Sequence, residues 1–253
     1  MKDIIDLYNN AYKNFTPDYF VPSNMGKIDH YLQENTQTLR DFLSKYKDQF
    51  DLDFKFQSSS CLELGCGIGS LSFFLEQSFH SVTALDFSPL AIAHAKTLKS
   101  MKSSHVKFLT EDITQESLAL EEEFDFIIDS HLFHCLTDEG ERRRYVENIK
   151  SALAENGVLI LETMVFNPEL RFPIGYSYDE HKTLWIDEPE NNRLIPIRKI
   201  STAREIEAFF LECGLKIEYL FYHNELSFCP YPDFPNHPIE QLPKTLRLCM
   251  RLA

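Results

Sequence analysis

The sequence predicts an α/β fold built on a doubly wound, mostly parallel sheet, and two observations carry this prediction. The first is the stretch 61–69, CLELGCGIG, in which an apolar strand pattern ends in glycines at every second position. Glycine lets the backbone turn where a Cβ would clash, and residues 70–75 then read as a helix whose first amides face the turn. The second is a series of short apolar strands with polar ends, which parallel sheets produce: 82–86, 106–109, 124–129 and 157–162.

A strand, a glycine turn and a helix start form the place where α/β proteins hold nucleotide-like ligands. The dinucleotide fingerprint G-x-G-x-x-G requires a third small residue that packs the helix against the strand. The chain has Gly65, Gly67 and Gly69, but Ser70 stands where that fingerprint wants Gly or Ala. The dinucleotide pattern therefore fails at its last position.

The pattern Glu63-x-Gly65-x-Gly67-x-Gly69 instead resembles motif I of the class I S-adenosylmethionine-dependent methyltransferases. The resemblance extends over residues 61–163, because the later motifs match in order and spacing. It implies a Rossmann-like, seven-stranded sheet with helices on both faces. It also implies S-adenosyl-L-methionine as the cofactor and S-adenosyl-L-homocysteine as its product.

The resemblance assigns cofactor roles residue by residue. It places Asp86, which ends the strand 82–86, on the ribose diol, and Asp112 near the adenine amino group with Ile113 against the ring. Glu63 is implied near the amino group of the ligand, although an acid inside a strand can also serve only to brace the turn. The full set of cofactor candidates is Glu63, Gly65, Cys66, Gly67, Gly69, Asp86, Phe87, Glu111, Asp112, Ile113 and Asp129.

Composition and charge narrow the class of partner. The 253 residues are 43% hydrophobic and 25% charged, as in globular proteins, and the formal net charge is −14. Nucleic acids require clustered cations, and the only basic run, 142–144, reads as a solvated helix face. The loop Asp129-Ser130-His131-Leu132 also departs from the Asn- or Asp-Pro-Pro-aromatic tetrapeptide of methyltransferases that act on nucleic-acid bases. We therefore expect a small-molecule acceptor and no nucleic-acid partner.

The cysteines and the apolar runs indicate a compartment. Six cysteines show no C-x-x-C pair and no disulfide-like spacing, so they read as free thiols in a reducing environment. The N-terminus lacks a signal-peptide pattern, and no apolar run approaches the ~18 residues that a membrane span needs. We expect a cytoplasmic protein with no membrane partner.

Residues 1–57 precede the first strand and read as a helical cap, while residues 58–253 read as the cofactor-binding domain. A first helix is indicated by Tyr8, Tyr12 and Phe15 at helical spacing. A second helix is indicated by one apolar stripe: Ile28, Leu32, Leu39, Phe42 and Tyr46. In the resembled family such helices lie over the ligand, so Tyr8, Tyr12 and Tyr19 are candidates for ligand or substrate contacts.

Local signals mark the later elements. Ser88 and Pro89 open a helix that runs to about residue 101, a helix over 138–154 is followed by Gly157, and Thr202 with Glu205 forms a capping box. A sixth strand covers 216–222. The seventh, antiparallel strand of the family is expected at 246–252, with 225–229 as the alternative.

About forty residues lie between Glu162 and Thr202, and the insertion among them, 165–200, is longer than an ordinary connection between a strand and a helix. The apolar stretches 184–186 and 194–197 predict a hairpin with a polar tip. The segment is aromatic, and Tyr176 and Trp185 are its candidates for covering a substrate. The alternative is a structural flap or a dimer contact.

Candidate catalytic groups follow the fourth strand, because ligands of open parallel sheets lie beyond the carboxyl ends of the strands. His131 and His134 stand there and could bind substrate or serve as a general base if the acceptor holds its proton tightly. Either could equally be a packing histidine. A metal site is not expected, because His131, His134 and Cys135 crowd into one loop rather than forming a spaced ligand set.

These observations predict methyl transfer from S-adenosylmethionine to a small molecule by direct displacement. Three alternatives stay open. One is an NAD-dependent oxidoreductase, one is a methyltransferase-like protein that binds the cofactor but acts as a regulatory or interaction partner, and one is non-methyl transfer from a related sulfonium. The acceptor atom and the oligomeric state do not follow from the sequence.

Overall fold

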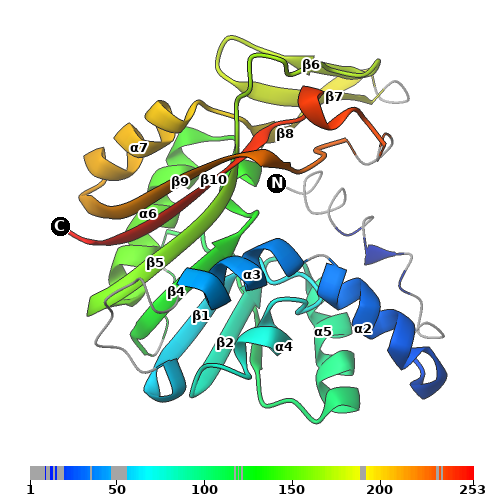
Figure 1. Ribbon diagram of the computed structural model, residues 1–253, viewed down its shortest axis with the longest axis vertical. Coiled ribbons are helices and arrows are strands. Elements are labelled where there is room, and N and C mark those ends of the chain that lie inside the picture. The colour runs from blue at the N-terminus through cyan, green and yellow to red at the C-terminus, as the bar shows by residue number, and fades with distance from the viewer. Residues whose placement is uncertain are drawn as a thin grey trace. The chain divides into compact units, whose positions relative to one another are not determined.

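The computed structural model in Figure 1 describes residues 9, 12, 13, 15, 20–34, 36–46, 56–116, 118, 120, 122–188, 192–231, 234 and 236–253. Tyr8 and Tyr19, two of the predicted contact residues, lie outside these residues, and so does most of the first predicted helix. The chain forms two compact units. Unit 1 comprises Met1–Ile113 with Leu118–Ser130, and unit 2 comprises Thr114–Ser117 with His131–Ala253. The predicted domain boundary between residues 57 and 58 stays a prediction.

The predicted seven-stranded α/β sheet is confirmed, with the strand order β3-β2-β1-β4-β5-β10-β9. In unit 1, β1 pairs in parallel with both β2 and β4, and β2 pairs in parallel with β3. The strands of this unit are β1 (Ser60–Leu64), β2 (Ser81–Asp86), β3 (Lys107–Thr110) and β4 (Phe124–Ser130). Its helices are η1 (Pro22–Asn24), α2 (Met25–Glu34), α3 (Gln37–Tyr46), η2 (Phe56–Ser58), α4 (Ser72–Leu75) and α5 (Pro89–Lys102).

Unit 2 holds the C-terminal strands and a second, smaller sheet. β10 (Lys244–Leu252) runs antiparallel to both β5 (Leu153–Val165) and β9 (Leu215–Ser227), so the seventh strand is where the sequence predicts it. The three-stranded sheet is formed by β6 (Tyr176–Tyr178), β7 (Thr183–Glu188) and β8 (Arg193–Lys199). The helices are η3 (Phe133–Cys135), α6 (Glu139–Ala152), α7 (Ala203–Glu212) and η5 (Ile239–Gln241).

The predicted helix caps are present. The Ser88 side chain caps α5 by accepting a hydrogen bond from the Ala91 amide. Thr202 and Glu205 form the predicted capping box at the start of α7, and Gly214 closes that helix with a φ of 80°. The strands of the predicted hairpin are β7 and β8, which pair antiparallel, and residues 189–191 of the predicted polar tip lie outside the described residues. Short-range signals therefore place the ends of these elements correctly.

Four predictions about individual elements were wrong. The helix expected over 70–75 is shorter, because α4 begins only at Ser72. The stripe over 28–46 is divided between α2 and α3, and it breaks at Thr36, whose hydroxyl donates to the Leu32 carbonyl while its own carbonyl accepts from the Arg40 amide. The alternative seventh strand at 225–229 does not form as a separate element, since β9 continues to Ser227.

The fourth wrong prediction concerns the end of α6. The helix ends at Ala152 and passes directly into β5 through Leu153, whose backbone is extended. Gly157 therefore does not cap the helix. It lies within β5, where a Cβ would stand 2.7 Å from Leu153 Cδ1 and 2.9 Å from the Ala154 carbonyl oxygen. The glycine is needed for close packing and not for a helix stop.

The basic run on α6 is also not a fully solvated face. Arg142 is only 3% exposed, its guanidinium lies 4.0 Å from the centre of the Phe133 ring, and its Nε donates to the Leu136 carbonyl at 2.9 Å. Burial lowers the pKa of Arg142 to about 10. A cation over an aromatic face gains electrostatic energy, and this contact explains how an arginine packs inside the helix interface.

Candidate functional site

In unit 1 the glycine turn connects β1 to α4 through three left-handed backbone conformations. Gly65, Gly67 and Gly69 have φ values of 68°, 54° and 89°. A Cβ at Gly67 would lie 2.8 Å from the Tyr12 hydroxyl, and one at Gly69 would lie 2.8 Å from Phe108 Cζ. Both the backbone angles and the close neighbours therefore require glycine at these positions.

Asp86 ties the end of β2 to the turn. Its Oδ2 accepts a hydrogen bond from the Gly67 amide at 2.9 Å, and its Oδ1 accepts one from the Ser88 amide at 2.8 Å. Burial raises the pKa of Asp86, while these two amides oppose the shift. A carboxylate offers about four lone-pair sites, so two amide donors leave acceptor capacity for the hydroxyls of a ligand.

Glu63 lies in β1 and is buried. Burial raises the pKa of Glu63 to about 8, the hydroxyl of Ser72 at the start of α4 opposes this rise by donating to Oε2, and the charge of Asp86 adds to it. The bond to Ser72 joins the strand to the helix across the glycine turn. Glu63 thus braces the turn, which is one of the two roles that the sequence left open, and its role toward a ligand stays a prediction.

Two residues of the N-terminal segment contact this part of unit 1, one at the start of α5 and one at the glycine turn. The Ser88 hydroxyl donates to Asn9 Oδ1 at 2.6 Å, and the Tyr12 hydroxyl lies beside Gly67. Tyr12 was a predicted contact residue, and its contact with a ligand stays a prediction.

The remaining cofactor candidates lie at strand ends of unit 1. The Glu111 amide donates to the Asp86 carbonyl at 3.2 Å, which brings the segment after β3 next to the end of β2. Ile113 is buried, and Asp129, paired in register with Leu64 of β1, is fully buried. Cys66 is buried, whereas Phe87, Glu111 and Asp112 are partly exposed. Their contacts with a cofactor stay predictions.

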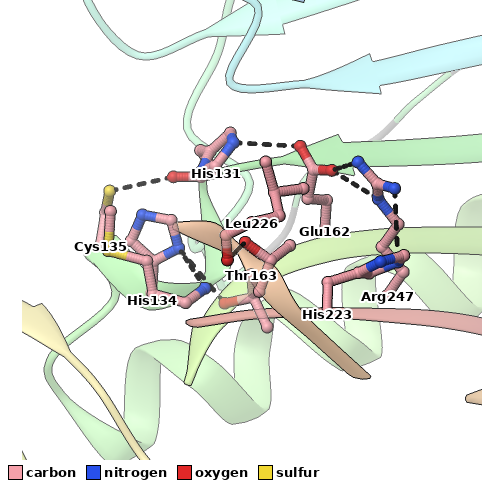
Figure 2. A network of polar contacts seen from close by, with 10 residues as sticks. His131, His134, Cys135, Glu162, Thr163, His223, Leu226 and Arg247 are labelled. Carbon is pink, nitrogen blue, oxygen red and sulfur yellow. Dashed lines mark hydrogen bonds and ion pairs between the residues drawn. The ribbon is translucent and has the colours of Figure 1, made fainter. Parts of the chain in front are cut away.

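In unit 2 a polar network begins at His131, directly after β4 (Figure 2). His131 has a left-handed backbone with a φ of 76°, and its amide donates to the Glu162 carbonyl at 3.1 Å. Its Nε2 lies 3.0 Å from Glu162 Oε1, its ring contacts Phe228 edge to face at 4.0 Å, and its side chain is 27% exposed. The backbone and side chain of β5 therefore hold one partly exposed imidazole in place.

Glu162 is shared between His131 and Arg247. The Glu162 side chain is 1% exposed, and its Oε2 lies 2.6 Å from Nε and 2.5 Å from the terminal NH2 nitrogen of Arg247. Burial by itself raises the pKa of Glu162. The hydrogen bond and charge of His131 and those of Arg247 outweigh burial, so the pKa lies below its usual value. The carboxylate is therefore ionised at neutral pH.

His134 is placed differently, although it is three residues away. Its side chain is buried, and its Nδ1 lies 3.2 Å from Thr163 Oγ1 and accepts from the Met164 amide at 3.3 Å. Burial, followed by the charges of His131, Arg198 and Arg142, lowers the pKa of His134 well below its ordinary value. Its contacts are those of a neutral packing histidine, which favours His131 over His134 as the residue that meets a substrate.

The substrate candidates of the small sheet have contacts of their own. Trp185 Nε1 donates to Asp179 Oδ2 at 2.8 Å, and the ring of Tyr176 packs edge to face on Tyr231 at 4.8 Å. These contacts order the aromatic segment, and its role toward a substrate stays a prediction. Among the described residues, no group of three or more His, Cys, Asp and Glu side chains could hold a metal.

The network contains residues that sequence reasoning missed, namely Glu162, Arg247 and His223. Arg247 stands directly opposite Glu162 in the pairing of β10 with β5. A signal was available: Arg247 is a charged residue inside the apolar run 246–250, and such a charge needs a buried partner. The identity of the partner depends on strand register and is not readable from either strand alone.

A family model described as a methyltransferase domain matches residues 62–159. An uncharacterized methyltransferase of Staphylococcus carnosus is 25% identical over 158 residues, which are 62% of this chain and 68% of that protein. A 2-heptyl-1-hydroxyquinolin-4(1H)-one methyltransferase of Mycobacteroides abscessus is 31% identical over 123 residues, 47% of this chain and 53% of that protein.

Solved structures share the fold over most of the chain. The crystal structure of an S-adenosylmethionine-dependent methyltransferase from Clostridium acetobutylicum superposes with a TM-score of 0.60 at 16% identity, covering 90% of this chain and 99% of that one. In the described part of the chain, no helix is long and apolar enough to cross a membrane.

Proposed function

We propose that this chain is a class I S-adenosylmethionine-dependent methyltransferase and that it transfers the methyl group to the hydroxyl oxygen of a small aromatic or heteroaromatic molecule. The observation that carries this proposal is the pair formed by His131 and Glu162 directly after β4. A hydroxyl is a weak nucleophile while it keeps its proton, so its methylation benefits from a positioned base.

The residues of unit 1 fit the cofactor of this family. Gly65, Gly67 and Gly69 leave the turn without Cβ atoms, and Asp86 keeps acceptor capacity beyond its two amide donors. Bound S-adenosylmethionine supplies an activated methyl group on a sulfonium, which a nucleophile displaces directly. We infer that Asp86 would hold the ribose hydroxyls and that the turn would lie against the rest of the ligand. Ser70 and the methyltransferase relatives argue against the NAD alternative.

The residues of unit 2 support an acceptor that has to lose a proton. The Nε2 atom of His131 faces Glu162, so Nδ1 is the ring nitrogen that remains for a substrate hydroxyl. The ring is partly exposed, whereas the carboxylate that orients it is buried. An imidazole held by a carboxylate on its other nitrogen is a standard arrangement for a general base. His131 would take the proton of the hydroxyl as the oxygen attacks the methyl carbon.

Two observations support an aromatic acceptor. The Mycobacteroides abscessus relative is named for a hydroxyquinolone, which is a heteroaromatic molecule with an N-hydroxyl group. The segment between β5 and α7 and the part of the chain beyond β9 supply the rings of Tyr176, Trp185 and Phe228, which can pack against a flat acceptor.

The test is a methyl-transfer assay on the purified protein with S-adenosylmethionine and four groups of acceptors: N-hydroxy heterocycles, phenols, aromatic amines and thiols. The first probe is 2-heptyl-1-hydroxyquinolin-4(1H)-one, the hydroxyquinolone in the name of the Mycobacteroides abscessus relative. The matched control is the same molecule without its N-hydroxyl group. Product is measured by mass spectrometry as a methylated acceptor together with S-adenosylhomocysteine. We expect turnover with hydroxyl acceptors and about a 10²–10⁴-fold loss of that turnover in His131→Ala.

The proposal would be overturned by turnover confined to amines or thiols. It would also be overturned if the His131→Ala variant methylated the hydroxyl acceptor as fast as the wild type. A Lys96→Ala variant on α5 serves as the control for surface substitution, because Lys96 is exposed and lies in unit 1.

A further inference from the structure

The network of unit 2 does more than hold one histidine, because it extends across three strands. Figure 2 shows the contacts running from His131 through Glu162 on β5 to Arg247 on β10 and His223 on β9. The hydrogen bonds that hold the glycine turn of unit 1 do not involve these residues. Each contact joins residues of the same compact unit.

We propose that Arg247 is a positioning residue that keeps Glu162 charged and thereby fixes the proton of His131 on Nε2, which leaves Nδ1 as the proton acceptor. This inference rests on the proposed role of His131 as the base. It adds the residue that sets which nitrogen of that base is available.

The first step is that the two oxygens of the Glu162 carboxylate contact different partners. Arg247 contacts Oε2 of Glu162, at 2.6 Å from Nε and 2.5 Å from the terminal NH2 nitrogen, and His131 Nε2 contacts the other oxygen, Oε1, at 3.0 Å. The two partners therefore do not compete for one oxygen. Arg247 is directly opposite Glu162 in the antiparallel ladder, so the strands themselves fix the distance between the charges.

The second step is the negative charge of Glu162, which its contact with Arg247 maintains. The side chains of Glu162 and Arg247 are 1% and 4% exposed, and a buried carboxylate without a cation tends to keep its proton. An ionised carboxylate can only accept hydrogen bonds, whereas a protonated one can also donate. While Glu162 is ionised, the neutral imidazole of His131 must therefore donate from Nε2. If Glu162 held a proton, it could donate to Nε2, and the ring proton would move to Nδ1.

The third step is the support of Arg247 at its far end. One of its terminal nitrogens lies 3.4 Å from His223 Nε2, and His223 Nδ1 lies 3.1 Å from the exposed Glu225 carboxylate. Among the described residues, the titratable and charged groups of this network around His131 are Glu162 on β5, His134 and Cys135 on η3 and, through Glu162, Arg247 on β10 with His223 and Glu225 on β9. Arg247 is the only permanently charged cation in this set.

A purely structural role of the Glu162–Arg247 pair can be distinguished from the proposed positioning role. Buried ion pairs are weak stabilisers, and well-packed apolar replacements are often as stable, so fold stability alone does not require this pair. The proposal instead makes a statement about the position of one proton. That position is measurable in the full chain without a substrate, because the 15N chemical shifts of an imidazole differ between its two neutral tautomers.

The experiment records 15N spectra of the His131 ring in the wild type, Arg247→Met and Arg247→Lys, at about pH 8.5 where an ordinary histidine is neutral. The wild type is expected to carry its proton on Nε2. Arg247→Met is expected to populate the Nδ1–H tautomer. Arg247→Lys, which keeps a cation beside Glu162, is expected to retain the Nε2–H tautomer of the wild type. Arg251→Met is the matched control, since Arg251 lies on the same strand β10 and contacts the Asn156 carbonyl instead.

The second readout is kcat/KM against pH for methylation of the hydroxyl acceptor. Without Arg247, burial raises the pKa of Glu162, so the loss of activity toward low pH should begin at a higher pH than in the wild type. We expect Arg247→Met to have a lower kcat/KM than the wild type at every pH at which its Nδ1–H tautomer is populated, pH 8.5 included, and to recover only above that range. Arg247→Lys and Arg251→Met should keep the wild-type profile.

The outcomes separate the two proposals. An Nδ1–H tautomer in the wild type would overturn the positioning role at once, even if no variant folds. A wild-type tautomer and a wild-type pH profile in folded Arg247→Met would overturn it as well. If instead the tautomer responds as expected but His131→Ala methylates hydroxyl acceptors normally, the positioning of the ring stands and the proposed role of His131 as the base fails.

Discussion

Asp86 at the end of β2 accepts a hydrogen bond from the Gly67 amide at 2.9 Å. An acid at the end of β2 therefore fixes the turn that follows the neighbouring strand, β1. The same carboxylate accepts from the Ser88 amide at the start of α5. The turn, the second strand and the next helix are therefore joined by one side chain, and the residue expected to bind the ribose is also a structural element of its own site.

Substitution of Asp86 should consequently affect both binding and stability. Asp86→Asn keeps one carbonyl oxygen that can accept from Gly67 but loses the charge and one acceptor, so we expect weaker cofactor binding with a modest loss of stability. Asp86→Ala removes the acceptor of both amide hydrogen bonds and should lower the free energy of unfolding by about 1–3 kcal/mol. Calorimetric titration of S-adenosylmethionine and chemical denaturation measure the two effects. Unchanged affinity in both variants would contradict the ribose assignment.

Tyr12 should control how tightly the glycine turn is covered. Its hydroxyl lies 2.8 Å from the point where a Cβ of Gly67 would stand, so Tyr12→Ala should change the affinity for the cofactor and leave the sheet intact. Gly67→Ala should be more severe, because it adds a clash with Tyr12 to a left-handed backbone, a conformation that costs about 1 kcal/mol or more for alanine. In the double variant Tyr12→Ala with Gly67→Ala, the clash is absent and only the backbone cost remains.

Glu63 makes the stability of the protein without ligand depend on pH. Burial raises the pKa of Glu63 to about 8, which is above the value of the unfolded chain. The folded protein therefore binds more protons than the unfolded one between these two values, and the free energy of unfolding falls as pH rises through this range. Glu63→Gln should remove this dependence and should be more stable than the wild type near pH 8 by on the order of a few kcal/mol. Denaturation curves at several pH values check this, and parallel curves for the two proteins would refute it.

His134 should produce the opposite dependence at lower pH. Its folded-state pKa is lowered by burial, so the unfolded chain takes up a proton that the folded chain excludes as pH falls below the ordinary histidine value. Stability should then decrease by up to about 1.4 kcal/mol per pH unit on acidification. His134→Gln should flatten this slope even if it lowers the overall stability. His30→Gln, at an exposed position on α2, is the matched control and should leave the slope unchanged.

Local signals predicted much of the fold, including the glycine turn. The ends of β1 and β2, the caps of α5 and α7, and the glycine turn depend on residues close together in the sequence, and these predictions are confirmed. The break at Thr36 escaped detection because an apolar stripe with helical spacing continues across it. The strand β6 escaped because three residues are too short for a periodic pattern.

The polar network was harder to predict for a different reason. Glu162 and Arg247 are 85 residues apart, and they meet only because β10 pairs antiparallel with β5 in one register. Likewise, the sequence presents His131 and His134 as equivalent, and only tertiary packing separates a partly exposed imidazole from a buried one.

The backbone of His131 carries a further consequence. A φ of 76° is unfavourable for a side chain with a Cβ, at a cost of roughly 1–2 kcal/mol, although histidine tolerates it better than most residues. Glycine at this position would relieve the strain while removing the imidazole. Variants selected for heat resistance alone should therefore accumulate replacements at residue 131 and lose turnover, whereas selection for turnover should retain a histidine that the fold itself does not favour.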